Sequence, residues 1–263
     1  MKNEMNDLVY MHLQASERFV VSNGVSFCEF VSSLPDPLPY TLLLKHQLEE
    51  TEFNLNVLMD FVPPEYIQDF IRKEWKPAGD FCWVDFEDPA CLDELEGQEI
   101  AELLYMGHTK NHLNSPFFRK LNNRFAYLSI EDSLLSKVYY RSLDEYFCQL
   151  GKLISLKAEA QESGRSWIFR KRNCELLPVP QEAVRLIAPL LSEGVVFSMR
   201  QMRKSRIKIE IPLYLVGDFM NFDEMMEEYQ QASIREPDVW LIFQKKSKDW
   251  TVAKNKSRNE VPL

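Results

Sequence analysis

Two histidines four residues apart form the sharpest chemical pattern in this chain. His108 and His112 stand at positions i and i+4. On a helix this spacing places both imidazoles on one face, close enough to bind one metal ion. A metal site needs a further ligand, which neighbouring segments could supply from Asp85, Glu87, Asp88 or the pair Glu131 and Asp132. The alternative is that the histidines pack and cap a helix end. His108 and His112 are therefore candidate metal ligands, and His108 is also a candidate catalytic residue.

Acidic side chains surround an aromatic strand that we predict over residues 79–86. Asp80 and Asp85 lie within it, and Glu87 and Asp88 follow it directly. Two carboxyl groups at the end of a strand can act as a general acid and a general base if burial raises the pKa of one. The alternative is a set of solvated acids, with Asp88 capping the helix that follows. Asp85 and Asp88 are the candidate catalytic residues of this group.

The glycines exclude several classes of cofactor-binding protein. None of the eight glycines lies closer than ten residues to the next. A loop that cradles phosphate needs clustered glycines, so the pattern excludes P-loop NTPases and dinucleotide-binding Rossmann domains. The chain also lacks the G-x-S-x-G, H-E-x-x-H and paired C-x-x-C motifs. We expect no cofactor.

Composition predicts a globular protein of the cytoplasm. The 263 residues are 45% hydrophobic and 27% charged, and no apolar run approaches the roughly 18 residues of a membrane span. The first residues carry acids and no apolar stretch of the kind found in a signal peptide. The five cysteines are widely spaced and odd in number, which favours free thiols in a reducing compartment.

Charge is distributed unevenly along the chain. Residues 1–150 contain 12 Lys/Arg and 25 Asp/Glu, whereas residues 151–263 contain 19 and 15. This asymmetry indicates two subdomains of different electrostatic character. We place an acidic subdomain at residues 1–157 and a smaller one at residues 166–263, joined by a small, polar linker at residues 158–165.

Hydrophobic periodicity predicts an α+β fold with mixed or antiparallel sheets and interspersed helices. Alternation indicates strands, and capping residues with a 3.6-residue period indicate helices. The expected strands include residues 7–14, 18–22, 53–61, 79–86, 207–211 and a closing hairpin within 239–253. The expected helices include residues 89–95, 98–112, 142–157, 181–192 and 221–231.

A basic segment in the second half raises the possibility of nucleic-acid binding. Residues 164–208 contain ten Lys/Arg and three acids, with Trp167 and Phe169 among them. However, residues 209–238 contain eight acids and one arginine. Neutralisation within the molecule, or docking onto the acidic first half, explains the basic segment more economically. We therefore expect a protein partner rather than nucleic acid, and no membrane partner.

Two stretches within residues 62–150 resemble the SUKH domains (the SMI1/KNR4-like family). Val62–Ile71 contains proline, acid, tyrosine and phenylalanine at the spacing of that family's first helix, and Val138–Phe147 is similar to its closing strand and helix. Residues 75–79 lack the usual Asn-Gly-Gly. The resemblance implies a non-enzymatic role in binding a partner protein, often in bacterial toxin immunity, and it transfers no site residues.

These observations favour a non-enzymatic protein-binding or regulatory module. The alternative is a metal- or carboxylate-dependent hydrolase centred on residues 80–140. An enzyme requires a concave site at which its reactive groups converge, whereas a binding module can present a flat aromatic patch.

Overall fold

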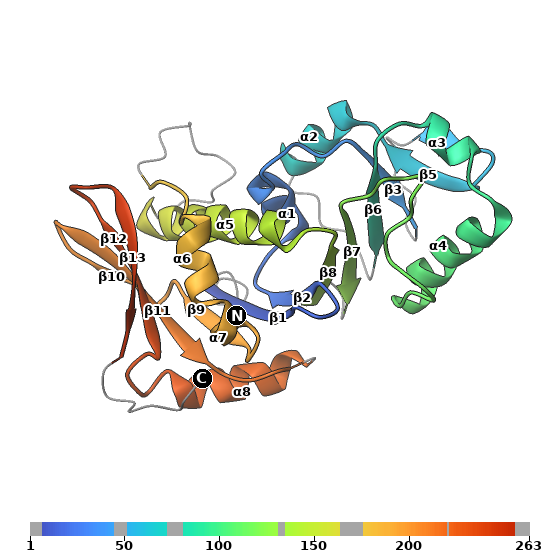
Figure 1. Ribbon diagram of the computed structural model, residues 1–263. Helices are drawn as coiled ribbons and strands as arrows, with labels where there is room; N and C mark the ends of the chain where they lie inside the picture. The colour runs from blue at the N-terminus through green and yellow to red at the C-terminus, as the bar shows by residue number, and fades with distance from the viewer. Residues whose placement is uncertain are drawn as a thin grey trace. The chain divides into compact units, whose positions relative to one another are not determined.

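A computed structural model describes residues 7–44, 52–72, 81–130, 135–163, 176–219 and 221–255. These residues form eight helices and thirteen strands, and every strand pairing described is antiparallel (Figure 1). The predicted α+β class is confirmed. Asp80, Glu131 and Asp132, three of the acids considered above, lie outside the described residues.

The chain divides into two compact units. Unit 1 comprises residues 1–13, 21–25 and 147–263, and unit 2 comprises residues 14–20 and 26–146. Helix α5 runs from Leu143 to Ser163, so the expected linker is helical from residue 158 to residue 163. The division between the units instead follows residue 146.

Unit 2 is built on an antiparallel sheet in the order β8-β7-β6-β3-β5-β4, and strand β2 (Phe19–Asn23) contributes its first two residues to this unit. The strands of the sheet are β3 (Tyr40–Leu43), β4 (Glu52–Asn54), β5 (Met59–Val62), β6 (Cys82–Phe86), β7 (Phe125–Ile130) and β8 (Leu135–Tyr140). The helices are α1 (Phe27–Ser33), α2 (Pro64–Arg72), α3 (Ala90–Asp93) and α4 (Gly97–Thr109).

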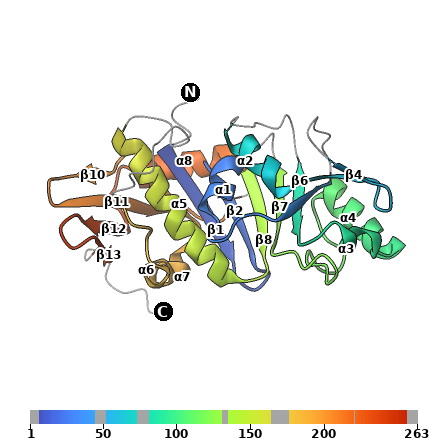
Figure 2. The ribbon, with the colours of Figure 1, turned by 90° about the horizontal axis from the view of Figure 1, so that it is seen from above.

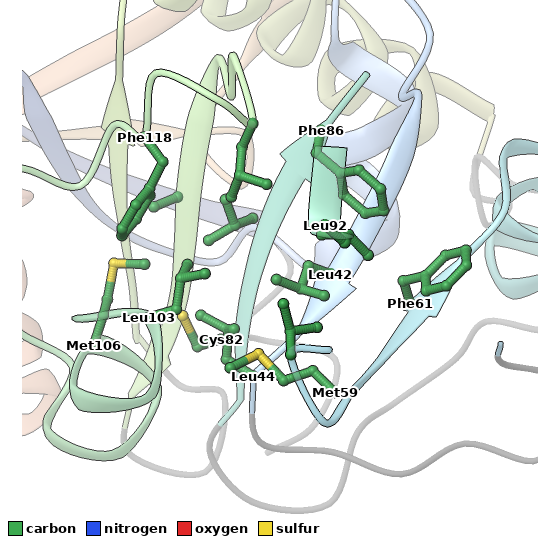
Figure 3. Packing of buried hydrophobic residues seen from close by; sticks show 14 of the residues in the cluster. Leu42, Leu44, Met59, Phe61, Cys82, Phe86, Leu92, Leu103, Met106 and Phe118 are labelled. Carbon is green, nitrogen blue, oxygen red and sulfur yellow. The ribbon is translucent and has the colours of Figure 1, made fainter. Parts of the chain in front are cut away.

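One face of this sheet packs against α3 and α4. Alternate residues of the strands, among them Leu42, Phe61 and Val84, meet Leu92 of α3 and Leu103 of α4 in a buried cluster (Figure 3). Because side chains alternate across a strand, the residues between them point to the opposite face. The period-2 pattern of the sequence therefore specifies which strand residues lie on the face that α3 and α4 cover.

The opposite face of the unit 2 sheet is aromatic. Phe27 of α1 packs against Trp83 and Tyr127, with ring centroids 4.4 and 5.1 Å apart, and Phe30 packs edge-on to Phe125 at 5.2 Å. The capping box of α1 fixes the start of this helix: Ser26 Oγ accepts from Glu29 N, and Glu29 Oε2 accepts from Ser26 N. The aromatic residues predicted from strand alternation are thus core residues.

The predicted single strand at residues 53–61 is wrong. These residues form a hairpin in which β4 and β5 are joined by a turn at residues 55–58. The Asn54 side chain accepts hydrogen bonds from the backbone amides of Asn56 and Val57, and Leu58 adopts a left-handed φ of 54°. A local Asx turn reverses the chain where alternation alone predicts continuation.

The strands of unit 1 follow the order β13-β12-β11-β9-β1 within the single thirteen-stranded sheet, and β10 pairs with β11. Its strands are β1 (Leu8–Gln14), β9 (Val195–Ser198), β10 (Arg203–Lys204), β11 (Lys208–Leu215), β12 (Val239–Gln244) and β13 (Asp249–Lys254). The helices α6 (Gln181–Leu186), α7 (Ala188–Leu191) and α8 (Phe222–Ala232) belong to this unit together with most of α5. The predicted strands at residues 7–14 and 207–211, the closing hairpin and the Asn221 cap of α8 are confirmed.

Candidate functional site

Asp85 lies on β6, buried to 1% exposure and opposite Thr41 of β3 in the strand register. Its Oδ1 accepts hydrogen bonds from the backbone amides of Arg124 at 2.9 Å and Phe125 at 3.0 Å. Its Oδ2 accepts from Arg124 Nε at 3.2 Å. Burial raises the pKa of the Asp85 carboxyl group, and the hydrogen bonds and the guanidinium oppose that rise. The side chain is thus held by the start of β7 rather than presented to a substrate.

Arg124 joins Asp85 to two other segments of unit 2. Its Nη2 donates to Pro37 O at 3.1 Å, and its Nη1 lies 3.3 Å from Glu145 Oε1 and 3.8 Å from Asp36 Oδ2. Burial also raises the pKa of the Glu145 carboxyl group, whereas the Arg124 charge lowers it. The cluster therefore ties β6, the loop before β3 and the start of α5 together. No local pattern predicts this role of Arg124, because its partners are remote in the chain.

Asp88 and the two histidines lie apart from this cluster in the contacts described. Asp88 is exposed and accepts from Ala90 N at 2.8 Å at the start of α3, which is the capping role considered for it. His108 is exposed in the last turn of α4, which ends at Thr109 before Lys110 adopts a left-handed conformation.

The prediction that His108 and His112 share one helix face is wrong, because α4 ends between them. The His112 ring instead packs edge-on to Tyr139, with centroids 5.1 Å apart. Across the part of the chain that the structure describes, no group of three or more His, Cys, Asp and Glu side chains is arranged to bind a metal.

A histidine–carboxylate contact in unit 1 was missed by sequence reasoning. His12 Nδ1 of β1, a buried side chain, lies 2.9 Å from Oδ1 of the exposed Asp218. On the same face of β1, the Tyr10 hydroxyl donates to Gly217 O and accepts from Phe219 N, both at 3.0 Å. Burial raises the pKa of Tyr10 to about 12, so this hydroxyl stays protonated at neutral pH. The contacts fix the loop before α8 to β1, and no local pattern could reveal them because about 200 residues separate the partners.

The β4–β5 hairpin presents three exposed apolar side chains. Phe53, Leu55 and Leu58 are 54%, 82% and 69% exposed. The turn that carries them is anchored to α3: Asn54 Nδ2 donates to Asp93 Oδ1 at 3.0 Å, and Asn56 Nδ2 donates to Leu92 O at 2.8 Å. We call Phe53, Leu55 and Leu58 the hairpin anchor. The alternating pattern from residue 53 predicts that Phe53 and Leu55 lie on a buried strand face, and the structure shows both exposed.

The comparisons with known proteins found no family model, no curated protein and no solved structure that matches this chain. Within the described residues, no helix has both the length and the apolar character needed to cross a bilayer.

Proposed function

We propose that this chain is a non-enzymatic, cytoplasmic protein-binding module whose contact with its partner centres on the hairpin anchor. The observation that supports this proposal is the exposure of Phe53, Leu55 and Leu58 on a turn held in place by hydrogen bonds. The resemblance of residues 62–150 to SUKH domains favours the same class of activity.

The energetics favour the hairpin anchor as a contact surface. Burying a leucine side chain contributes about 1.5–3 kcal/mol, so two leucines and a phenylalanine can supply much of the binding free energy of a modest interface. Because the turn is already fixed to α3, binding would cost little additional conformational entropy. Isolated apolar side chains are common on protein surfaces, but these three lie within six residues of one hydrogen-bonded hairpin.

Charge around the hairpin defines the partner further. Glu52, Asp93 and Glu94 are exposed on β4 and α3 next to the anchor, and Asp93 is bonded to the turn itself through Asn54. β4 is also the terminal strand of the unit 2 sheet in the strand order described. We therefore propose a partner protein that offers an apolar pocket with a basic rim.

Affinity capture with a matched pair of variants tests this proposal. Leu55→Asp/Leu58→Asp changes the anchor, and Leu186→Asp/Ile234→Asp changes two residues of unit 1 that are similarly exposed, at 66% and 86%. All four side chains are largely exposed, so both variants should fold. A protein retained by the wild type and by the control, but lost with the anchor variant, would support the proposal. Equal retention by all three proteins, or no specifically retained protein, would refute it.

A further inference from the structure

We propose that one end of the unit 1 sheet binds single-stranded nucleic acid through a cluster of cations on two neighbouring β-turns. We call this surface the cationic end; its residues are Arg203, Lys204, Arg206, Lys208, Lys245, Lys246 and Lys248. It lies in unit 1, whereas the hairpin anchor lies in unit 2, so this inference is independent of the proposed protein-binding function.

The first turn, between β10 and β11, is held rigidly by Ser205. Ser205 N donates to Lys208 O at 2.9 Å, and the Ser205 hydroxyl accepts from the backbone amides of Ile207 and Lys208 at 3.3 and 3.1 Å. This ring of hydrogen bonds leaves Arg206 and Ile207 exposed at the tip. The cation at the tip therefore has a fixed backbone from which to reach a phosphate.

The second turn, between β12 and β13, lies directly beside the first. Lys245 N donates to Ile207 O at 2.8 Å, and Lys208 pairs with Gln244 in the register of β11 and β12. Figures 1 and 2 show both turns at the same end of the sheet. Residues about 40 positions apart in the sequence thus form one cationic surface. Lys245, Lys246 and Lys248 fall outside the basic segment considered in the sequence.

The charges of this surface are only partly neutralised. Lys208 forms an ion pair with Glu210 at 2.7 Å, and Lys204 Nζ donates to the uncharged backbone carbonyl of Gln161 at 3.1 Å. In the described part of the chain, Arg206, Lys246 and Lys248 form no ion pair with a carboxylate. Unpaired cations on neighbouring turns favour a polyanionic ligand, because each phosphate contact releases condensed counterions.

The acidic block at residues 209–238 does not cover this end of the sheet. Its helix, α8, packs beside the other end of β11, where the Tyr214 and Tyr229 ring centroids are 5.8 Å apart. Tyr214 lies six residues beyond Lys208 on an extended strand, roughly 20 Å away. Of this block, Glu210 lies within the cationic end, where it pairs with Lys208 and stands opposite Arg203 in the strand register. Glu236 and Asp238 lie within electrostatic range of Tyr214, as Arg203 does, and no ion pair joins them to Arg206, Lys246 or Lys248 among the described residues. Four cations of the predicted basic segment, within residues 165–172, lie outside the described residues.

Arg203 favours nucleic acid over other polyanions. Its guanidinium lies 4.5 Å from the centroid of the Trp240 ring, and the side chain is exposed. An arginine stacked on tryptophan is held flat, and its outer face can stack on an unpaired base. Ile207, 65% exposed, is the apolar side chain at the tip; one aliphatic side chain is too small to anchor the protein stably in a lipid surface. Single-stranded RNA and DNA both offer the phosphates and unpaired bases that this arrangement recognises.

Fluorescence anisotropy with labelled 20-nucleotide oligo(U) and oligo(dT) tests the inference. Arg206→Glu/Lys246→Glu removes one cation from each turn. Arg235→Glu/Lys254→Glu changes the net charge equally elsewhere in unit 1, where Lys254 stands at the far end of the β12–β13 hairpin. The wild type should bind with a log–log salt slope of about −2, or roughly twentyfold weaker binding at 200 mM than at 50 mM salt, for three phosphate contacts. The turn variant should make this slope shallower by about 1.4, at −0.7 per contact, while the control keeps it.

Arg203→Lys separates stacking from charge. It keeps the positive charge but loses the planar guanidinium, so we expect weaker binding with an unchanged salt slope. Stronger binding of oligo(U) than oligo(dT) would identify RNA as the ligand, and the reverse would identify DNA. The inference is overturned if the wild type binds neither oligonucleotide at 50 mM salt, or if both charge variants weaken binding equally. Equal or tighter binding of poly-glutamate or of phosphatidylserine vesicles would also overturn it.

Discussion

Asp85 offers the sharpest test of how the buried charges of unit 2 work. Asp85→Ala removes the acceptor of two backbone amides, those of Arg124 and the buried Phe125. A buried donor left without a partner costs about 1–3 kcal/mol. Because Arg124 is partly exposed and keeps its contacts with Pro37 and Glu145, we expect a total loss of about 2–4 kcal/mol. Differential scanning calorimetry should show this loss as a fall in Tm of roughly 5–15 °C.

Asp85→Asn is the matched control, because its side-chain oxygen can still accept both backbone hydrogen bonds. It loses only the charge-assisted bond to Arg124 Nε, and it removes a carboxylate that is costly to bury. We expect a loss of about 1 kcal/mol. If Asp85→Ala were as stable as Asp85→Asn, the hydrogen bonds from the backbone amides to Asp85 would not stabilise the contact between β6 and the start of β7.

The pH dependence of the same pair follows from the raised pKa of Asp85. The native carboxyl group keeps its proton at a pH where the unfolded chain, with a pKa near 3.9, has lost it. The free energy of unfolding contributed by this group therefore falls as pH rises through the native pKa and is recovered as pH is lowered. In urea titrations, the stability gap between wild type and Asp85→Asn should widen as pH is lowered through the native pKa of Asp85. A gap that narrows would show that the carboxylate is net stabilised in the native state.

Two further predictions concern the packing at a helix glycine and the hydroxyl group of Tyr10. Gly151→Ala would place a Cβ 2.1 Å from the backbone oxygen of Val179, so thermal unfolding should show a loss of stability although alanine favours helices by about 1 kcal/mol. Gly97→Ala meets nothing within 4 Å and should be neutral or stabilising; equal effects of the two substitutions would contradict the packing described. Tyr10→Phe removes the acceptor of the Phe219 amide, and a loss of about 1–2 kcal/mol is expected in chemical denaturation. An unchanged stability would mean that water replaces the hydroxyl.

Local signals predicted much of the secondary structure. Strict alternation over residues 207–211 located β11, and Asn221 followed by two acids located the start of α8, whose cap is formed by the Asn221 side chain. In both elements the pattern of apolar residues and the capping chemistry agree with the tertiary packing. Such agreement lets a single sequence specify an element without knowledge of its neighbours.

The failures occurred where a side chain or an unusual backbone conformation overrides the pattern. The alternation from Phe53 continues through a turn that Asn54 creates by accepting two amides. Helix α4 ends at Thr109, because the next residue, Lys110, adopts a left-handed φ of 57°. Glycine or asparagine would have signalled that end, and lysine does not. Both errors changed the functional interpretation: the first concealed an exposed apolar turn, and the second created an apparent metal pair.

The residues that suggested chemistry in the sequence have structural contacts instead. Asp85 binds the start of β7, Asp88 accepts from the first turn of α3, and His112 packs on Tyr139. No single-sequence pattern distinguishes a carboxylate that holds a strand from one that activates water, because the difference lies in partners remote in the chain. The cationic end was missed for the same reason, because its two turns are about 40 residues apart in the sequence and become neighbours only in the folded sheet.

The two proposed surfaces can be separated experimentally because each belongs to one compact unit. The hairpin anchor is apolar with acidic neighbours, whereas the cationic end is basic and has one exposed aliphatic side chain. The salt dependence of binding should therefore differ in steepness: nucleic-acid binding should weaken steeply as salt rises, and binding to the apolar anchor should depend on salt only through its charged rim. Substitutions at Leu55 and Leu58 should leave the oligonucleotide salt slope unchanged, and substitutions at Arg206 and Lys246 should leave protein capture unchanged. Loss of both activities from either variant would indicate one continuous binding surface, and the assignment of one ligand to each unit would then be wrong.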